Sequence, residues 1–200
     1  MRTAARPDYS RRDAILDAAL ACFLRDSVAG TTIDDIKARS GASVGSIYHH
    51  FGSKEGIAAE LYLDILGAYH EAFLGHLTAS STAREGIAGS VRLHLRWVAT
   101  STDRARYLFH CREPEVITGS GSAVRDLNKV FYARATQWIE RYVESGDIRP
   151  LSPEVCQALW MGPCMEFARQ WLASSRRRPS ALTGAAPVLG EAAWDALRLR

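Results

Sequence analysis

Few side chains in this sequence could perform catalysis, and their spacing matches no common catalytic pattern. Asp34 and Asp35 are adjacent, while His70, His94 and His110 are far apart in the chain and have no HxxxH or HxxE spacing. The sequence contains no nucleophile elbow, phosphate-binding loop or dinucleotide fingerprint. The two aspartates are explained as acids in the first turn of a helix. We therefore expect a protein that is not an enzyme and that has no catalytic residues, no cofactor and no metal.

The cysteines and the apolar segments bear on the protein's surroundings. Cys22, Cys111, Cys156 and Cys164 have no near Cys or His at zinc-finger spacing, which favours reduced, buried thiols. A redox role for Cys111, which follows His110, is the alternative. No apolar run approaches the roughly 20 residues of a membrane span. The N-terminus lacks the apolar segment of a secretory signal, so we expect a cytoplasmic protein with no membrane partner.

The charge balance says little about the partner. The 200 residues carry a net charge of +3, and up to Gly56 there are eight Lys/Arg against seven Asp/Glu, which leaves +1. Any binding of nucleic acid must therefore depend on where individual charges lie, because their overall excess is small.

Hydrophobic periodicity and helix-capping signals predict an all-α chain. Thr32 and Asp35 have the spacing of a capping box, as do Ser10 and Asp13. Gly41 directly follows the helix expected at 33–40, at the position where a residue in the left-handed conformation commonly ends a helix. The helices are expected at 11–26, 33–40, 44–50, 54–77, 83–100, 103–111, 123–144, 153–174 and 190–199, with a loop at 114–122 and a linker at 176–187.

The two short helices at 33–40 and 44–50 predict a helix-turn-helix. A turn of about three residues that includes Gly41 joins them, which is the connection typical of this motif. Their apolar positions are spaced to form a small core against the first helix; these are Ile33, Ile36, Ile47 and Phe51.

Residues 32–55 resemble the DNA-binding signature of the TetR (tetracycline-repressor-like) family. The shared features are Ile33 and Ile36, Gly41 at the turn, and the run from Ile47 to Phe51 followed by Ser53 and Lys54. The resemblance implies an N-terminal three-helix helix-turn-helix domain, residues 1–53. It also implies that a long helix joins this domain to a C-terminal helical ligand-binding and dimerisation domain, residues 54–200.

The same resemblance implies a function. It predicts a bacterial transcriptional regulator that binds a palindromic double-stranded DNA operator as a homodimer. The expected activity is repression, relieved by a small-molecule effector of apolar or aromatic character. An activator, or a non-catalytic helical interaction protein, is the alternative.

Residues at the expected DNA interface follow partly from the helix positions. The N-terminal end of a recognition helix meets base edges in the major groove, and Val44, Gly45 and Ser46 lie there. Gly45 allows close approach, and Val44 either contacts a thymine methyl or is only a surface residue. Thr32 and Ser43 begin helices whose amides can bind a phosphate.

The resemblance adds contacts to the DNA backbone at Tyr48, His49, His50 and Lys54. A lysine at a helix N-terminus opposes the helix dipole, and a bound phosphate would give Lys54 a reason to be there. Arg11 and Arg12 either reach the DNA or are solvated.

The resemblance also implies an effector cavity between the fourth and seventh helices. Aromatic side chains with a few polar tips suit an apolar ligand, although such residues commonly form ordinary core. The candidates are Tyr69, His70, Phe73, His94, Trp97, Tyr107, His110 and Phe131.

An apolar stripe on the helix expected at 153–174 predicts a dimer surface. Together with apolar residues at 123–144 it exceeds what one neighbouring helix buries, which favours a four-helix interface between two copies. The candidates are Trp138, Trp160, Cys164, Phe167 and Trp171.

Overall fold

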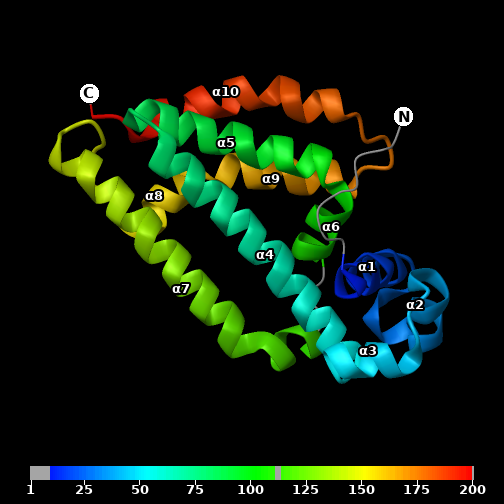
Figure 1. Cartoon of the computed structure of the whole chain (residues 1–200). Helices are drawn as coiled ribbons and strands as arrows, with labels where there is room; N and C mark the ends of the chain where they lie inside the picture. Colours follow the sequence, from blue (N-terminus) through cyan, green and yellow to red (C-terminus); the bar gives the residue numbers. More distant parts are fainter. Residues whose placement is uncertain (1–9, 111–113, 200) are drawn as a thin grey trace, which may run out of the picture. The chain divides into compact units, whose positions relative to one another are not determined.

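The chain folds into α-helices (Figure 1). The structure, a computed structural model, describes the backbone of residues 10–110 and 114–199, and their side chains except at 110 and 114–120. The all-α prediction is confirmed: these residues form no strand, only an isolated bridge between Ile148 and Arg198. None of their helices is long and apolar enough to cross a membrane. The helices are α1 (Arg11–Gly30), α2 (Ile33–Ser40), α3 (Val44–Phe51), α4 (Lys54–Ala79), α5 (Ala83–Thr100), α6 (Thr102–His110), α7 (Pro114–Glu144), α8 (Pro153–Trp160), α9 (Gly162–Ala173) and α10 (Pro179–Leu197).

The residues divide into two compact units. Unit 1 comprises Met1–Ile65 and Arg106–Ala123, and unit 2 comprises Leu66–Ala105 and Val124–Arg200. The helices α4, α6 and α7 each pass from one unit into the other. The functional division expected between residues 53 and 54 stays a prediction.

In unit 1, short side chains set the ends of the first helices. The Thr32 hydroxyl accepts a hydrogen bond from the backbone N–H of Asp35, whose carboxylate accepts one from the backbone N–H of Thr32. Ser10 and Asp13 form the same reciprocal pair at the start of α1. These two capping boxes confirm the expected helix starts, since each satisfies N–H groups that a helix N-terminus leaves unpaired.

The ends of α1 and α2 also follow the sequence. Ser27 has φ 64°, which interrupts the regular helix of α1 directly after residue 26, where the first helix was predicted to end. Gly41 adopts the left-handed conformation, with φ 68°, and its N–H bonds to the carbonyl of Lys37. The side chains of Ile36, Ile47 and Phe51 are buried, as the predicted small core requires.

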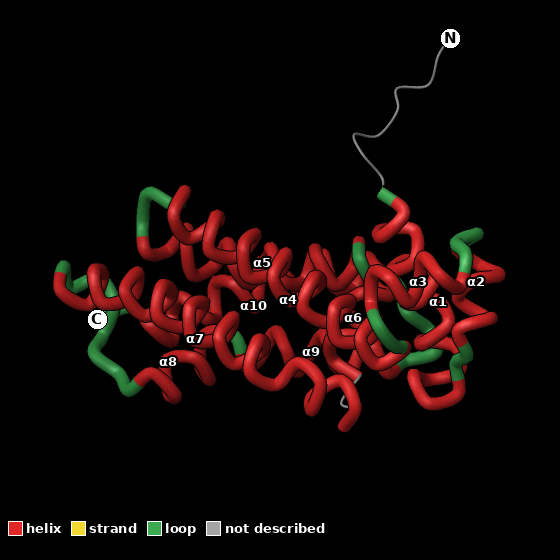
Figure 2. The backbone as a smooth tube through the Cα atoms, turned by 60° about the horizontal axis from the view of Figure 1, so that its bottom comes forward, coloured by secondary structure: helices red, strands yellow, loops and turns green. Residues whose placement is uncertain are grey.

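In unit 2, α5 lies at the centre of a helical bundle. The helices α9 and α10 pack against α5, and α8 packs against both of them (Figure 1). Contact with α10 is close, because a Cβ atom on Gly190 would lie 2.9 Å from the carbonyl oxygen of Ala88. Trp160 of α8 donates from Nε1 to the hydroxyl of Ser90 on α5, at 2.8 Å. Figure 2 shows the loops and turns of the chain in green between its helices.

Two segments predicted as non-helical are helical. Helix α7 begins at Pro114 and includes the glycine- and serine-rich stretch 118–122 that the sequence predicted as a loop. Helix α10 begins at Pro179, so most of the predicted linker at 176–187 is helical and Pro187 lies inside the helix. Buried Leu182, Ala186 and Gly190 repeat every four residues along α10, so tertiary packing outweighs the local cost of proline.

One predicted helix is divided. The segment expected as a single helix at 153–174 forms α8 and α9, which meet at Met161. Gly162 and Pro163 follow at once; proline fits the first turn of a new helix, where its missing N–H is no loss.

The conformation of Gly41 gives a prediction about stability. A Cβ atom would meet nothing within 4 Å at Gly41, yet φ there is 68°, so Gly41→Ala is expected to lower the free energy of unfolding by about 1 kcal/mol through backbone strain alone. Gly45, also in open space but helical, is the matched control, where alanine is expected to be neutral or stabilising. Urea unfolding measures both, and equal effects of the two changes would contradict this account.

Candidate nucleic-acid interface

Helix α3 presents one face that is open and one that is buried. Ile47 and Phe51 face the core of unit 1, while Tyr48 is 49% exposed. The predicted contact residues Gly45, His49 and His50 are exposed as well, and Val44 and Ser46 are half-buried. The open face therefore has small side chains at the N-terminal end of α3 and hydrogen-bonding side chains towards its C-terminal end. Small side chains allow close approach to the groove of a nucleic acid, and hydrogen-bonding side chains can contact its phosphates.

The two helix caps differ in what they offer a phosphate. At α2 the carboxylate of Asp35 accepts from both the hydroxyl and the N–H of Thr32, and these bonds hold the pKa of Asp35 below its usual value. A phosphate arriving at Thr32 would meet this negative charge. At α3 the Ser43 hydroxyl accepts from the N–H of Ser46 at 3.1 Å, and the first turn contains no acid. The N-terminus of α3 is thus the more favourable of the two for an anion.

Lys54 has a structural partner that sequence reasoning missed. Its Nζ donates to the carbonyl oxygens of Ala29, at 3.1 Å, and Thr31, at 2.9 Å. These carbonyls lie at the C-terminal end of α1, where the helix dipole favours a cation. A bound phosphate is therefore not needed to explain the position of this lysine, and a contact between Lys54 and DNA stays a prediction.

Arg12 is similarly committed within unit 1. Its guanidinium donates to Glu60 of α4 from Nη2 at 2.9 Å and Nε at 3.2 Å, and lies 3.7 Å from Asp64. Arg11 beside it is exposed. Helix α1 is thus attached to α4 near both ends, by Arg12 at one and through Lys54 at the other.

Tyr107 belongs to the core of unit 1. It is 1% exposed, its ring stacks on Phe23 of α1, and its hydroxyl donates to the carbonyl of Ala58 on α4. These contacts occupy both the ring and the hydroxyl, so the expectation that Tyr107 lines an effector cavity has no support in its surroundings. His110, also expected there, lies outside the described side chains.

The other predicted effector residues gather in unit 2 as one aromatic cluster. The cluster is formed by Tyr69, His70, Phe73, His94, Trp97 and Phe131. His70 stacks on Phe131 with ring centroids 4.0 Å apart, and Tyr69 lies 4.8 Å from Trp97. The structure thus brings six of the predicted effector residues together, with their rings in direct contact, while binding of an effector by them stays a prediction.

Burial keeps the polar groups of this cluster neutral. Burial lowers the pKa values of His70 and His94 to about 4 and raises that of Tyr69 far above its ordinary range. Tyr69 and His94 share a hydrogen bond of 2.8 Å between the hydroxyl and Nδ1. Nδ1 of His70 is buried and has no hydrogen-bond partner among the described residues.

Most of the predicted dimer residues are used inside the chain. Trp160, Cys164 and Trp171 are at most 8% exposed, and Trp171 donates to the carbonyl of Arg178. Trp138 and Phe167 are half-buried. The apolar stripe of α8 and α9 therefore belongs to the core of unit 2, and the expectation that Trp160, Cys164 and Trp171 form a free surface does not fit their burial.

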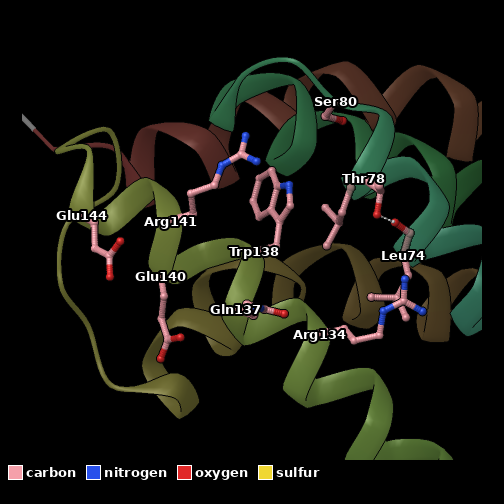
Figure 3. A pocket seen from close by; sticks show the side chains of 10 residues that line it. Leu74, Thr78, Ser80, Arg134, Gln137, Trp138, Glu140, Arg141 and Glu144 are labelled. Carbon is pink, nitrogen blue, oxygen red and sulfur yellow. Dashed lines mark hydrogen bonds between the residues drawn. The ribbon is translucent and has the colours of Figure 1, made fainter.

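An effector cavity was expected between the fourth and seventh helices, and a groove of about 560 Å³ lies between α4 and α7 in unit 2, but none of the predicted effector residues lines it. Figure 3 shows Trp138 in its centre, with Arg141 beside the indole and Arg134 below Leu74. The stripe of Arg134, Gln137, Trp138 and Arg141 on α7 was a signal that could have indicated it. No group of three or more potential metal ligands occurs among the described residues.

Comparison with known proteins identifies the class of the N-terminal unit. Residues 15–61, which include α2 and α3, match the family model described as "Bacterial regulatory proteins, tetR family". Helix α3 thus lies in a segment that is similar to bacterial regulatory proteins. Residues 15–61 are therefore similar to the tetR family, and the predicted resemblance of residues 32–55 to that family is confirmed.

Two curated relatives are HTH-type transcriptional repressors named KstR2. The protein from Rhodococcus jostii (strain RHA1) is 36% identical over 76 residues, which are 36% of this chain and 37% of that protein. The protein from Mycobacterium tuberculosis (strain ATCC 25618 / H37Rv) is 27% identical over 148 residues, 70% of each chain. The first of these matches therefore spans little more than a third of the relative's length.

The likeness in fold extends along most of the chain. The transcriptional regulator FadR from Bacillus subtilis, solved in complex with stearoyl-CoA, has a TM-score of 0.77. It is 19% identical, and the match covers 92% of this chain and 97% of FadR. The all-α fold of this chain is therefore one that a transcriptional regulator of known structure also adopts.

The contacts of Lys54 predict that this residue stabilises the protein. Lys54→Met removes two hydrogen bonds to helix-end carbonyls, and we expect the free energy of unfolding to fall by about 1–2 kcal/mol. Lys37→Met is the control, because Lys37 is exposed and lies 3.8 Å from Asp34; a change below about 0.5 kcal/mol is expected there. Equal stability of the Lys54 variant and the wild type in urea unfolding would show that these bonds contribute nothing.

The lowered pKa of His70 predicts a loss of stability in acid. The unfolded chain takes up a proton near pH 6.5, whereas folded His70 does so only near pH 4. Stability is therefore complete above pH 6.5 and falls as the pH drops towards 4, by about 2 kcal/mol at pH 5 for one such histidine. His70→Phe, which keeps a ring against Phe131, should make the difference in unfolding free energy between pH 7.5 and 5 smaller by that amount. An unchanged difference would rule out His70 as a source of the acid sensitivity.

Proposed function

We propose that this protein is a DNA-binding transcriptional regulator that acts as a repressor. The observation that carries the proposal is the open face of α3, which lies in a segment that matches the tetR family and has a capped, acid-free N-terminus. The two KstR2 relatives are repressors by name, and this supports repression over activation.

In the proposed complex, α3 enters the major groove of the operator. Gly45 allows close approach, and Val44 and Ser46 meet base edges at the helix N-terminus. Ser43, Tyr48, His49 and His50 bind phosphates on either side. The tip offers a methyl group and a hydroxyl but no guanidinium or amide, so DNA shape contributes much of the sequence preference.

We infer further that two copies bind together. A dimer matches a two-fold symmetric protein to a palindromic operator, with one α3 in each half-site. Exposed apolar side chains on α7, α8 and α9 support an interface there, formed by Val130, Tyr132, Val155 and Met165 rather than by the buried tryptophans.

A small-molecule effector completes the proposal. Helix α4 runs without interruption from the residue that follows the helix-turn-helix into unit 2, so a change in unit 2 reaches Lys54 through a continuous helix. FadR, which shares the fold, was solved with stearoyl-CoA bound, and this supports release of the operator by a ligand.

Operator binding is the direct test, and Tyr48 provides its sharpest variant. In a gel shift, the protein is expected to retard an intergenic fragment adjacent to its own gene, less strongly at higher salt. Tyr48→Phe removes one hydroxyl from an exposed side chain and should weaken binding about tenfold without changing stability.

Thr183→Val is the control. Thr183 is exposed on α10 in unit 2, outside both α3 and the proposed dimer contacts, so the loss of its hydroxyl should have no effect on the gel shift. A folded protein that retards none of the neighbouring fragments would overturn the proposed function. Equal affinity of the Tyr48 variant and the wild type would show that the assumed orientation of α3 is wrong.

A further inference from the structure

The groove between α4 and α7 has an apolar floor whose position is fixed. Leu74 and Leu77 of α4 are buried beside it, and the indole of Trp138 is half-buried. Trp138 lies against the backbone of α5, because a Cβ atom on Gly86 would come within 2.2 Å of its Cζ2 atom. The floor is therefore preformed and suits an apolar body of a ligand.

The charges around this floor favour an anion. Two arginines and two glutamates line the groove. Arg141 reaches beside the indole and Arg134 lies below Leu74, whereas the side chains of Glu140 and Glu144 point away from Trp138, so the arginines are the charges next to the apolar floor (Figure 3). Neither arginine forms an ion pair with a carboxylate within the described part of the chain. Arg141 is oriented by Tyr142, over whose ring it lies and whose hydroxyl accepts from Nη2 at 3.0 Å.

The remaining polar groups also select for a hydrogen-bond acceptor. The hydroxyl protons of Thr78 and Ser80 are already donated to the carbonyls of Leu74 and His76 of α4. The donors left to a ligand are thus the two guanidinium groups and the side-chain amide of Gln137. A ligand that brings a carboxylate satisfies these donors. An ammonium group would have to reach Glu140 or Glu144, whose side chains point away from Trp138 (Figure 3).

We propose that this groove binds an amphipathic monocarboxylate, with its apolar body on Trp138 and its carboxylate on Arg134 or Arg141. The two arginines are seven residues apart on α7, about 10.5 Å along the helix axis, so each offers a separate site for one singly charged head group. As the effector of the regulator, such a ligand rests on the proposed function; as a ligand of unit 2, it does not.

Calorimetric titration of the full chain with decanoate tests the assignment. Saturable binding is expected for decanoate, and no comparable binding for decyltrimethylammonium, which has an alkyl tail one carbon longer and the opposite charge. The double variant Arg134→Gln/Arg141→Gln should weaken decanoate binding at least tenfold. Arg125→Gln, an exposed arginine on the same helix outside the groove, should bind like the wild type.

Two outcomes overturn the assignment: the absence of saturable decanoate binding to the wild type, and equal binding by the double variant. A gel shift on the same samples separates this result from the proposed function. Retarded DNA without decanoate binding leaves the regulator and removes the groove as its ligand site. Decanoate binding without retarded DNA leaves the groove as a ligand site and removes the proposed regulator function.

Discussion

The attachment of α1 to the first turns of α4 is the constraint on which the arrangement of unit 1 depends. Arg12 is bound by Glu60 near one end of α1, and Lys54 is bound by two carbonyls at the other. A cation at helix-end carbonyls is favourable because it meets the negative end of the dipole. Only Gly52 and Ser53 separate α3 from α4. The hydrogen bonds that hold Lys54 at the start of α4 therefore also restrict the orientation of α3 relative to α1.

Tyr107 extends the same constraint to α6. Its hydroxyl holds the carbonyl of Ala58, and its ring packs on Phe23, so three helices share one buried contact. The segment of α4 from Lys54 to about Asp64 is thereby bound to α1 and α6 as one body. This agrees with the boundary of unit 1, which falls after Ile65 and not at the start of α4.

Local signals made the helix-turn-helix predictable from the sequence. A capping box spans three residues, and the left-handed glycine follows its helix directly, so Thr32, Asp35 and Gly41 could be assigned without knowledge of the fold. Lys54 could not, because its partners lie 23 and 25 residues away along the chain. The segment that contains Pro187 was wrongly predicted as a linker for the same reason. Burial of α10 against α5 stabilises the helix there, and no local sequence pattern indicates that burial.

The apolar stripes of unit 2 show a further limit. The residues at Trp160, Cys164 and Trp171 have the helical spacing of an interface, and a buried core produces the same spacing. What distinguishes a core from an interface here is the position of α5: the indole N–H of Trp160 donates to the hydroxyl of Ser90 on that helix. The aromatic set of α4, α5 and α7 was predicted as a group for the same reason, whereas its close packing depends on distances that no periodicity contains.

The placement of cations in unit 1 finally explains how a nearly neutral domain can suit DNA. Among residues 10–56, Arg12, Arg25, Lys37 and Lys54 bond to groups of the chain itself, which leaves Arg11 and Arg39. The release of counterions contributes in proportion to the phosphates neutralised, so this contribution is small for each copy. If α3 meets DNA as proposed, the affinity comes mainly from neutral donors at fixed positions and from the pairing of two copies. Rigid attachment of α3 then matters more than charge, since neutral hydrogen bonds depend on geometry at short range. The contacts of Arg12, Lys54 and Tyr107 provide that attachment.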